Sequence, residues 1–169
     1  MTLTKVHTNI IEGLDGHTLV GGQGSIIQEQ ITVFPDPFTN TSTSYLQTGM
    51  EVVITPKLAS SKIVVTSIFT IDYTATNHLY GFAARLYNLN TSAPIGLGVN
   101  GDALFYSGQA WNTGTAHLQY AIRAVDDQTN STALRIYGLA IRNVDGNSGS
   151  MKLNDSWGSN TITATEIAQ

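Results

Sequence analysis

The stretch AHLQYAIRA (Ala116–Ala124) decides the fold class. Every second residue in it is apolar or aromatic, and the positions between them include His117, Gln119 and Arg123. A period of two places the apolar side chains on one face of a β-strand, whereas an α-helix repeats every 3.6 residues. The pattern therefore predicts a strand that buries one face and exposes the other.

Other segments of the chain carry strand patterns as well. The longest is KIVVTSIFTIDY (Lys62–Tyr73), in which alternate apolar residues oppose Thr66, Thr70 and Asp72. This segment predicts a long strand with one buried face. Shorter segments of the same kind are Ile26–Val33, which stops at Pro35, then Met50–Thr55, Leu79–Tyr87 and Thr161–Ile167.

Turn-forming residues separate these segments. The chain has 22 Thr, 16 Gly and 12 Asn; threonine is β-branched and favours strands, while Gly and Asn favour tight turns. The cluster DDQTNS (Asp126–Ser131) lies between Ala116–Ala124 and Leu134–Val144, which predicts that these two strands form an antiparallel hairpin. About eight strands and no helical pattern predict an all-β domain, an antiparallel two-sheet sandwich of the jelly-roll type.

The first 23 residues have a composition of their own. Short apolar pairs are separated by glycines, so this segment can build no core by itself, yet it is too apolar for a solvated linker. We expect an extended N-terminal arm (residues 1–23) that lies on a partner, followed by the sandwich (residues 24–169). The alternative is a first strand and hairpin of the main domain. The residues expected to anchor the arm are Val6, Ile10, Ile11, Leu14, Leu19 and Val20.

Charge and cysteine content exclude several classes of function. The net charge is −4, so binding to nucleic acid or to anionic lipid lacks its main driving force. The chain has no cysteine, which excludes disulfides, thiolate zinc sites and cysteine nucleophiles. No apolar run has the length of a signal peptide or a membrane span. From the net charge and the lack of such a run, we expect neither nucleic acid nor membrane as a partner.

One glycine-rich string matches a cofactor fingerprint in spacing alone. GLGVNG (Gly96–Gly101) has the G-x-G-x-x-G spacing of dinucleotide-binding loops. That function needs a helix directly after the loop, and the following DALFY (Asp102–Tyr106) is too short to be one. We interpret the string as a loop between short strands and expect no cofactor.

Metal and catalytic patterns are weak. The four histidines, His7, His17, His78 and His117, show no ligand spacing. Asp126 with Asp127, and Asp145 with Asn147, offer oxygens that could hold calcium, although turn chemistry accounts for both pairs. No G-x-S-x-G string marks a nucleophilic serine. We therefore expect no catalytic residue and no metal, that is, a protein that is not an enzyme.

Three aromatic residues in neutral polar surroundings are candidate surface contacts: Tyr106, Trp111 and Trp157. Aromatic side chains with a polar edge are used for carbohydrate and protein contact. The alternative is that each belongs to the core or to an interface.

Two segments resemble a known group of proteins. STSYLQTGMEVVITPKLASSKIVV (Ser42–Val65) and the terminal SNTITATEIAQ (Ser159–Gln169) are similar to small β-rich phage virion structural proteins, which include tail-fibre-like and capsid decoration jelly-roll proteins. The opening TKVHTNIIEG (Thr4–Gly13) also resembles the start of tail-fibre-like proteins, whereas Asn88–Asn112 matches nothing in the group. The resemblance implies a jelly roll that trimerises on the virion surface, with no cofactor and no catalytic residue.

Two roles in a phage particle are open. An arm and one compact domain, without heptads or shaft repeats, favour a trimeric capsid decoration (cement) protein whose partners are its own copies and the major capsid protein. The alternative is a short tail fibre or receptor-binding tip on a tail or baseplate protein, touching host glycans through Trp111 and Trp157. A third reading is a non-viral carbohydrate-binding module. For the first two we expect synthesis in the host cytoplasm and a place on the virion surface.

Overall fold

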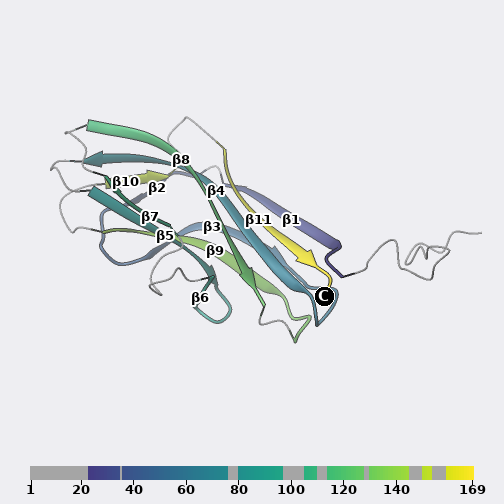
Figure 1. Ribbon diagram of the computed structural model, residues 1–169. Helices are drawn as coiled ribbons and strands as arrows, with labels where there is room; N and C mark the ends of the chain where they lie inside the picture. Colours follow the sequence, from purple (N-terminus) through teal and green to yellow (C-terminus); the bar gives the residue numbers. More distant parts are fainter. Residues whose placement is uncertain are drawn as a thin grey trace, which may run out of the picture.

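The computed structural model describes residues 23–34, 36–75, 80–96, 105–109, 114–127, 130–144, 150–153 and 159–169. Every helix or strand among them is a β-strand, and the strands form two antiparallel sheets that pack face to face (Figure 1). The fold is therefore an all-β sandwich, as predicted. The expected arm, residues 1–23, lies outside the described residues except for Gln23, so the domain boundary stays a prediction.

The first sheet is built around a long central strand, β4 (Lys62–Ala75). On one side β4 pairs along its length with β8 (Gly114–Asp126). On the other side its first half pairs with β11 (Asn160–Ile167) and its second half with β10 (Ser150–Leu153). Beyond these lie β1 (Ile26–Phe34), which pairs with β11, and β2 (Phe38–Asn40), which pairs with β10.

The second sheet has β9 (Arg135–Asn143) between β3 (Leu46–Ile54) and β5 (Tyr80–Asn88). The far edge of β5 pairs with two short strands, β6 (Ala93–Ile95) and β7 (Phe105–Gln109). The register of β3 against β9 shifts between Gln47 and Glu51, where Gly49 adopts φ +80°. A positive φ is open to glycine at little cost, so this irregularity depends on Gly49.

Eight of the strands are paired in the order of a jelly roll. In chain order they are β1, β3, β4, β5, β7, β8, β9 and β11. The first pairs with the last, the second with the seventh, the third with the sixth and the fourth with the fifth, always antiparallel. One sheet therefore runs β1-β11-β4-β8 and the other β3-β9-β5-β7, which confirms the predicted jelly-roll type.

The predicted hairpin between Ala116–Ala124 and Leu134–Val144 is wrong. Both segments are strands, but β8 pairs with β4 in the first sheet and β9 pairs with β3 and β5 in the second. The turn residues after Asp126 cross from one sheet to the other. Each strand directs its apolar side chains into the space between the sheets, and a crossing connection achieves this without pairing the two strands.

The core lies between the sheets and is made by the alternating positions that the sequence pattern identified. Its largest fully buried side chains include Tyr137, Phe69, Met50, Leu86 and Ile162. Strand β4 departs from the expectation of one buried face, because Thr70 and Asp72 on its other face are buried too. His117 of β8 lies against Asp72, so a neighbouring strand covers Asp72 at this end of the outer face.

Candidate interaction surface

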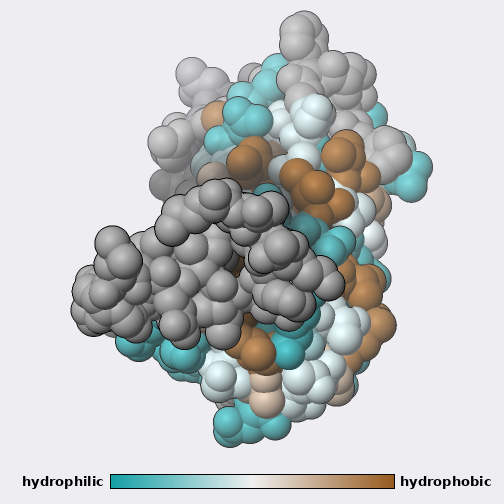
Figure 2. All heavy atoms as spheres, turned by 90° about the vertical axis from the view of Figure 1, so that its right-hand side faces the viewer, coloured by the Kyte–Doolittle hydropathy of each residue, from teal (hydrophilic) through white to brown (hydrophobic). Residues whose placement is uncertain are grey.

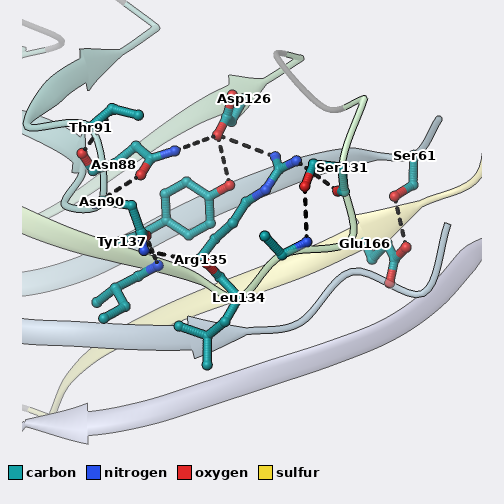
Figure 3. Close-up of polar contacts among 12 residues, drawn as sticks. Ser61, Asn88, Asn90, Thr91, Asp126, Ser131, Leu134, Arg135, Tyr137 and Glu166 are labelled. Atoms are coloured by element: carbon teal, nitrogen blue, oxygen red, sulfur yellow. Dashed lines mark hydrogen bonds and ion pairs between the residues drawn. The ribbon is translucent and has the colours of Figure 1, made fainter. Parts of the chain in front are cut away.

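A buried carboxylate ties the first sheet to the connection between β3 and β4 at one end of the sandwich. Glu166 of β11 is fully buried on the core side. Its Oε1 accepts hydrogen bonds from the amides of Lys57 and Leu58 at 2.9 Å each and from the Ser61 hydroxyl at 2.7 Å (Figure 3 labels Ser61 and Glu166). Its Oε2 accepts one from Nε2 of Gln28 at 2.6 Å.

These donors hold Glu166 in its ionised form. Burial alone would raise the pKa of its carboxyl, but the hydrogen bonds from Lys57, Ser61, Leu58 and Gln28 outweigh burial and lower it. A carboxylate that accepts several hydrogen bonds is a structural group whose capacity is already used. The contact also links the two segments that resemble phage virion proteins. Glu166 in the terminal segment Ser159–Gln169 binds Lys57, Leu58 and Ser61 in the segment Ser42–Val65.

A second buried carboxylate, Asp126 at the end of β8, lies in a network of its own. Its Oδ2 accepts hydrogen bonds from the Tyr137 hydroxyl at 2.8 Å and from Nδ2 of Asn88 at 3.1 Å, and Nη1 of Arg135 lies 3.5 Å away (Figure 3). Burial raises the pKa of Tyr137; the hydrogen bond with Arg135 opposes this shift and Asp126 reinforces it. The phenol therefore stays protonated and donates to Asp126.

The same network bears on the calcium hypothesis for Asp126 and Asp127. A pocket of about 120 Å³ beside Asp126 is lined by residues that include Asn88, Ile95 and Val125. The charge of Asp126, however, is already balanced by the buried Arg135 guanidinium, which disfavours a divalent cation at the same oxygen. Among the described residues no group of three or more His, Asp or Glu could hold a metal ion. Asp145 and Asn147 lie outside these residues.

A third acidic residue, Asp72, lies on the outer face of the first sheet between two basic residues. Nδ1 of His117 is 2.5 Å from Oδ1 of Asp72, and the two residues are cross-strand partners in β8 and β4. Lys152 of β10 occupies the partner position on the other side of Asp72. This arrangement links three neighbouring strands, so His117 has a structural role here.

Over β9 and β5 the outer face of the second sheet is covered by the chain's own side chains, whereas Val53 of β3 is 48% exposed. The guanidinium of Arg85 lies 4.1 Å from the centre of the Tyr45 ring, and that of Arg142 lies 5.1 Å from it. Nη1 of Arg142 also lies 3.4 Å from the carbonyl oxygen of Thr43. These contacts hold the segment before β3 on the sheet.

The outer face of the first sheet is open along most of its width. Its central positions are threonines of β11 and β4, and its exposed apolar residues come from three strands. Ile31 and Val33 of β1 are 63% and 59% exposed, Val125 of β8 is 45% exposed, and Ile68 of β4 is exposed as well. The register places Val33, Thr161, Ile68 and Ala121 in one row across the sheet.

The surface view places apolar groups at the end of the sandwich where β1 begins and the chain ends. There they form several patches between neutral and hydrophilic residues (Figure 2). Contiguous exposed apolar patches are typical of surfaces that contact another molecule. We call the outer positions of four strands the threonine–valine face. They are Glu29, Ile31 and Val33 of β1, Thr161, Thr163 and Thr165 of β11, Val64, Thr66 and Ile68 of β4, and Ala121, Arg123 and Val125 of β8.

The structure does not test the contact residues expected from the sequence. The arm residues Val6, Ile10, Ile11, Leu14, Leu19 and Val20, and both Trp111 and Trp157, lie outside the described residues. For Tyr106 the backbone is described: it belongs to β7 and pairs with Ala83 of β5.

Neither Glu166 nor the threonine–valine face was predicted from the sequence. The signal for Glu166 was in the pattern of the last strand, where it shares one side with Ile162 and Ala164. Both are buried, and a charged residue on a core side indicates a buried carboxylate. The face had no such signal, because β1 has apolar residues on both sides of its pattern.

Comparison with known proteins gives solved structures only, since no family model and no curated sequence matches the chain. The chain is similar to VP2 of infectious bursal disease virus in a subviral particle, at 13% identity and a TM-score of 0.38, over 86% of this chain and 39% of that one. VP2 of the Gx strain gives 14% identity, a TM-score of 0.34 and coverages of 85% and 33%.

The CBM22-1 xylan-binding domain of Paenibacillus barcinonensis Xyn10C gives 9% identity and a TM-score of 0.29, over 87% of this chain and 97% of that one. The fold assignment rests on the strand order described above. The described residues include no helix with the length and apolarity of a membrane span.

Proposed function

We propose that this protein is a virion structural protein, a trimeric capsid decoration protein that binds the assembled coat of a phage through its N-terminal arm and stabilises the head. The observation that carries the proposal is the contrast between engaged buried acids and an open apolar surface. Glu166 and Asp126 are used inside the fold, while Ile31, Val33 and Val125 are exposed on the threonine–valine face. Such a molecule is suited to adhesion.

The resemblance of Ser42–Val65 and Ser159–Gln169 to phage virion proteins supports the same role. Stabilisation would follow from linkage: a protein that binds only the assembled shell shifts the equilibrium toward that shell. Each apolar arm residue, such as Ile10 or Leu19, would contribute about 1.5–3 kcal/mol if fully buried against the coat. Three arms on one trimer would add their effect through effective concentration.

The experiment compares the full chain with a variant lacking residues 1–23, each added to purified capsids and sedimented. We expect the full chain to co-sediment at a saturable copy number and the truncated chain to remain in the supernatant. Circular dichroism of the truncated chain serves as the control for folding.

Binding that survives the truncation would overturn the role of the arm. Few copies per particle, found only in tail fractions, together with glycan binding by the purified protein, would overturn the decoration role and favour a receptor-binding tip.

A further inference from the structure

The first sheet ends in two long strands on opposite sides. Strand β1 has 9 residues and β8 has 13, and within the described part of the chain each pairs with a single neighbour, β1 with β11 and β8 with β4. Each thus has one edge without a strand partner among those residues. Long edge strands with exposed apolar side chains tend to pair with another chain, and natural proteins cover or blunt them.

The two edges are complementary in charge and alike in apolar character. On the outer face β1 has Glu29 beside the exposed Ile31 and Val33, whereas β8 has Arg123 beside the exposed Val125. Within the described residues the Arg123 side chain forms no hydrogen bond and no ion pair. Glu29 accepts a hydrogen bond from the Thr165 hydroxyl of its own chain at 3.0 Å, and a carboxylate can accept others. The outer side of the β1 edge thus carries a negative charge at Glu29 and that of the β8 edge a positive charge at Arg123, which favours contact between unlike edges over contact between like ones.

Strand direction favours the same contact. Three successive antiparallel pairings, β1 with β11, β11 with β4 and β4 with β8, leave β1 antiparallel to β8. Rotation about an axis parallel to the strands preserves their directions. The β1 edge of one copy can therefore lie antiparallel beside the β8 edge of the next, which is the pairing used throughout this fold.

The register of the sheet also matches across such a contact. Val33 lies in the same row as Ala121, Ile31 in the row of Arg123, and Glu29 in the row of Val125. Rotation about an axis along the strands keeps these heights. Glu29 of one copy then lies diagonal to Arg123 of the next, a separation that long side chains span.

We propose that copies of this protein associate head to tail, with the β1 edge of one copy against the β8 edge of the next, Glu29 diagonal to Arg123, and a strip formed by Ile31, Val33 and Val125 between them. Contacts between two different surfaces close into a ring when the rotation allows it. The inference rests on the proposed function only for the number of copies in the ring, which is three, and it names the interface between those copies.

Engineered cysteines give the decisive test, because the natural chain has none. The variant Val33→Cys/Ala121→Cys is oxidised as full-length purified protein and run on a non-reducing gel. Within one chain these positions are three strand spacings apart, about 14 Å, which is beyond disulfide reach. We expect covalent dimer and trimer and nothing larger, as a closed ring requires.

The matched control is Val53→Cys/Ala121→Cys, which moves one cysteine to an exposed position on β3 in the other sheet. It is expected to stay monomeric on the gel. Dimers from Val33→Cys alone would indicate contact between like edges, and ladders beyond the trimer would indicate open chains; either result overturns the proposal. Absence of any cross-link also overturns it.

Charge reversal provides a second route that needs no oxidation. Glu29→Arg and Arg123→Glu are each expected to raise, about tenfold, the protein concentration at which half of the trimer dissociates, as measured by sedimentation velocity. The double variant is expected to return this concentration to that of the natural chain. Glu51→Arg, on the other sheet, is the control for the charge change. Purified protein that is monomeric at all concentrations refutes the ring. Trimers that fail to bind capsids refute only the decoration role.

Discussion

The two sheets of this sandwich have outer faces that are finished in different ways. On the second sheet Ala83, Gly138 and Ala140 are buried although they point away from the core, and the side chains of Leu89 and Gln47 lie over Gly138. On the first sheet Ile31 and Val33 remain largely exposed. The difference teaches that the outer face over β9 and β5 is covered within the monomer, whereas apolar side chains at the β1 edge of the first sheet stay exposed.

The largest effect is expected at Glu166, which ties β11 of the first sheet to the connection between β3 and β4. Glu166→Gln removes the charge and replaces one of the two accepting oxygens by an NH₂ group. Even when the remaining oxygen takes the place of Oε1, the NH₂ group faces the Lys57 amide and Nε2 of Gln28, so donors meet donors in a buried site. We expect a loss of about 3 kcal/mol in the free energy of unfolding by urea. The same change at the exposed Glu29 should cost less than about 0.5 kcal/mol. Equal losses in the two variants would show that the hydrogen bonds to Glu166 contribute no more to stability than an exposed carboxylate does.

The same carboxylate predicts how stability depends on pH. The pKa of Glu166 is lowered in the folded state from its ordinary value of 4.5, so the unfolded chain binds its proton first as the pH falls. Its contribution is fully present above about pH 4.5 and is lost as the pH falls through the folded pKa. Urea unfolding between pH 3 and 6 should show a shallower acid limb for Glu166→Gln than for the natural chain; parallel limbs would contradict this account.

The next effect tests whether the outer face of the second sheet is closed. A Cβ on Gly138 would lie 3.0 Å from Cδ1 of Leu89 and 3.2 Å from Oε1 of Gln47. Gly138→Val should therefore lower the free energy of unfolding by about 2 kcal/mol through overpacking. Thr163→Val, a β-branched change on the threonine–valine face, should leave it within about 0.5 kcal/mol. A neutral Gly138→Val would mean that the face is open after all.

A smaller effect is expected for the aromatic ring on that same face. Tyr45→Ala removes the surface over which the guanidinium groups of Arg85 and Arg142 lie. Thermal unfolding should show a loss of about 1 kcal/mol, since the arginines are only partly buried. Tyr45→Phe keeps the ring and should lie close to the natural chain. A loss of similar size for Phe would assign the effect to the hydroxyl instead.

The smallest effect on stability belongs to the open face. Val33→Thr changes a side chain that is already 59% exposed and keeps its β-branching. The free energy of unfolding of the monomer should change by less than about 0.5 kcal/mol, while self-association measured by sedimentation should weaken. A large loss of monomer stability would show that Val33 packs within its own chain.

Strand patterns predicted the fold class because they depend only on which residues alternate. Ala116–Ala124 and Lys62–Tyr73 are both strands with one side in the core, and Pro56 follows the end of β3 as expected. The false hairpin between β8 and β9 shows the limit. Local turn residues indicate that the chain reverses or bends, and they do not say which sheet the next strand joins.

The candidate site was less predictable, because it depends on residues far apart in the chain. Glu166 and Lys57 are separated by 109 positions, and Asn88 and Asp126 by 38. The pairing of Asp126 with Arg135 and Tyr137 turned a candidate calcium ligand into part of a structural network. No spacing in the sequence reports such contacts, since they arise only when strands from different parts of the chain are adjacent.

The amino-acid sequence by itself determined that this chain is an all-β sandwich, because alternation and turn chemistry are local properties of neighbouring residues. The tertiary structure alone decided which outward-facing side chains are covered by the rest of the chain and which are exposed. Strands β1 and β8 form edges of the first sheet, whereas β5 and β9 lie side by side in the second. Exposure depends on what packs against a strand, and that is a property of the whole fold.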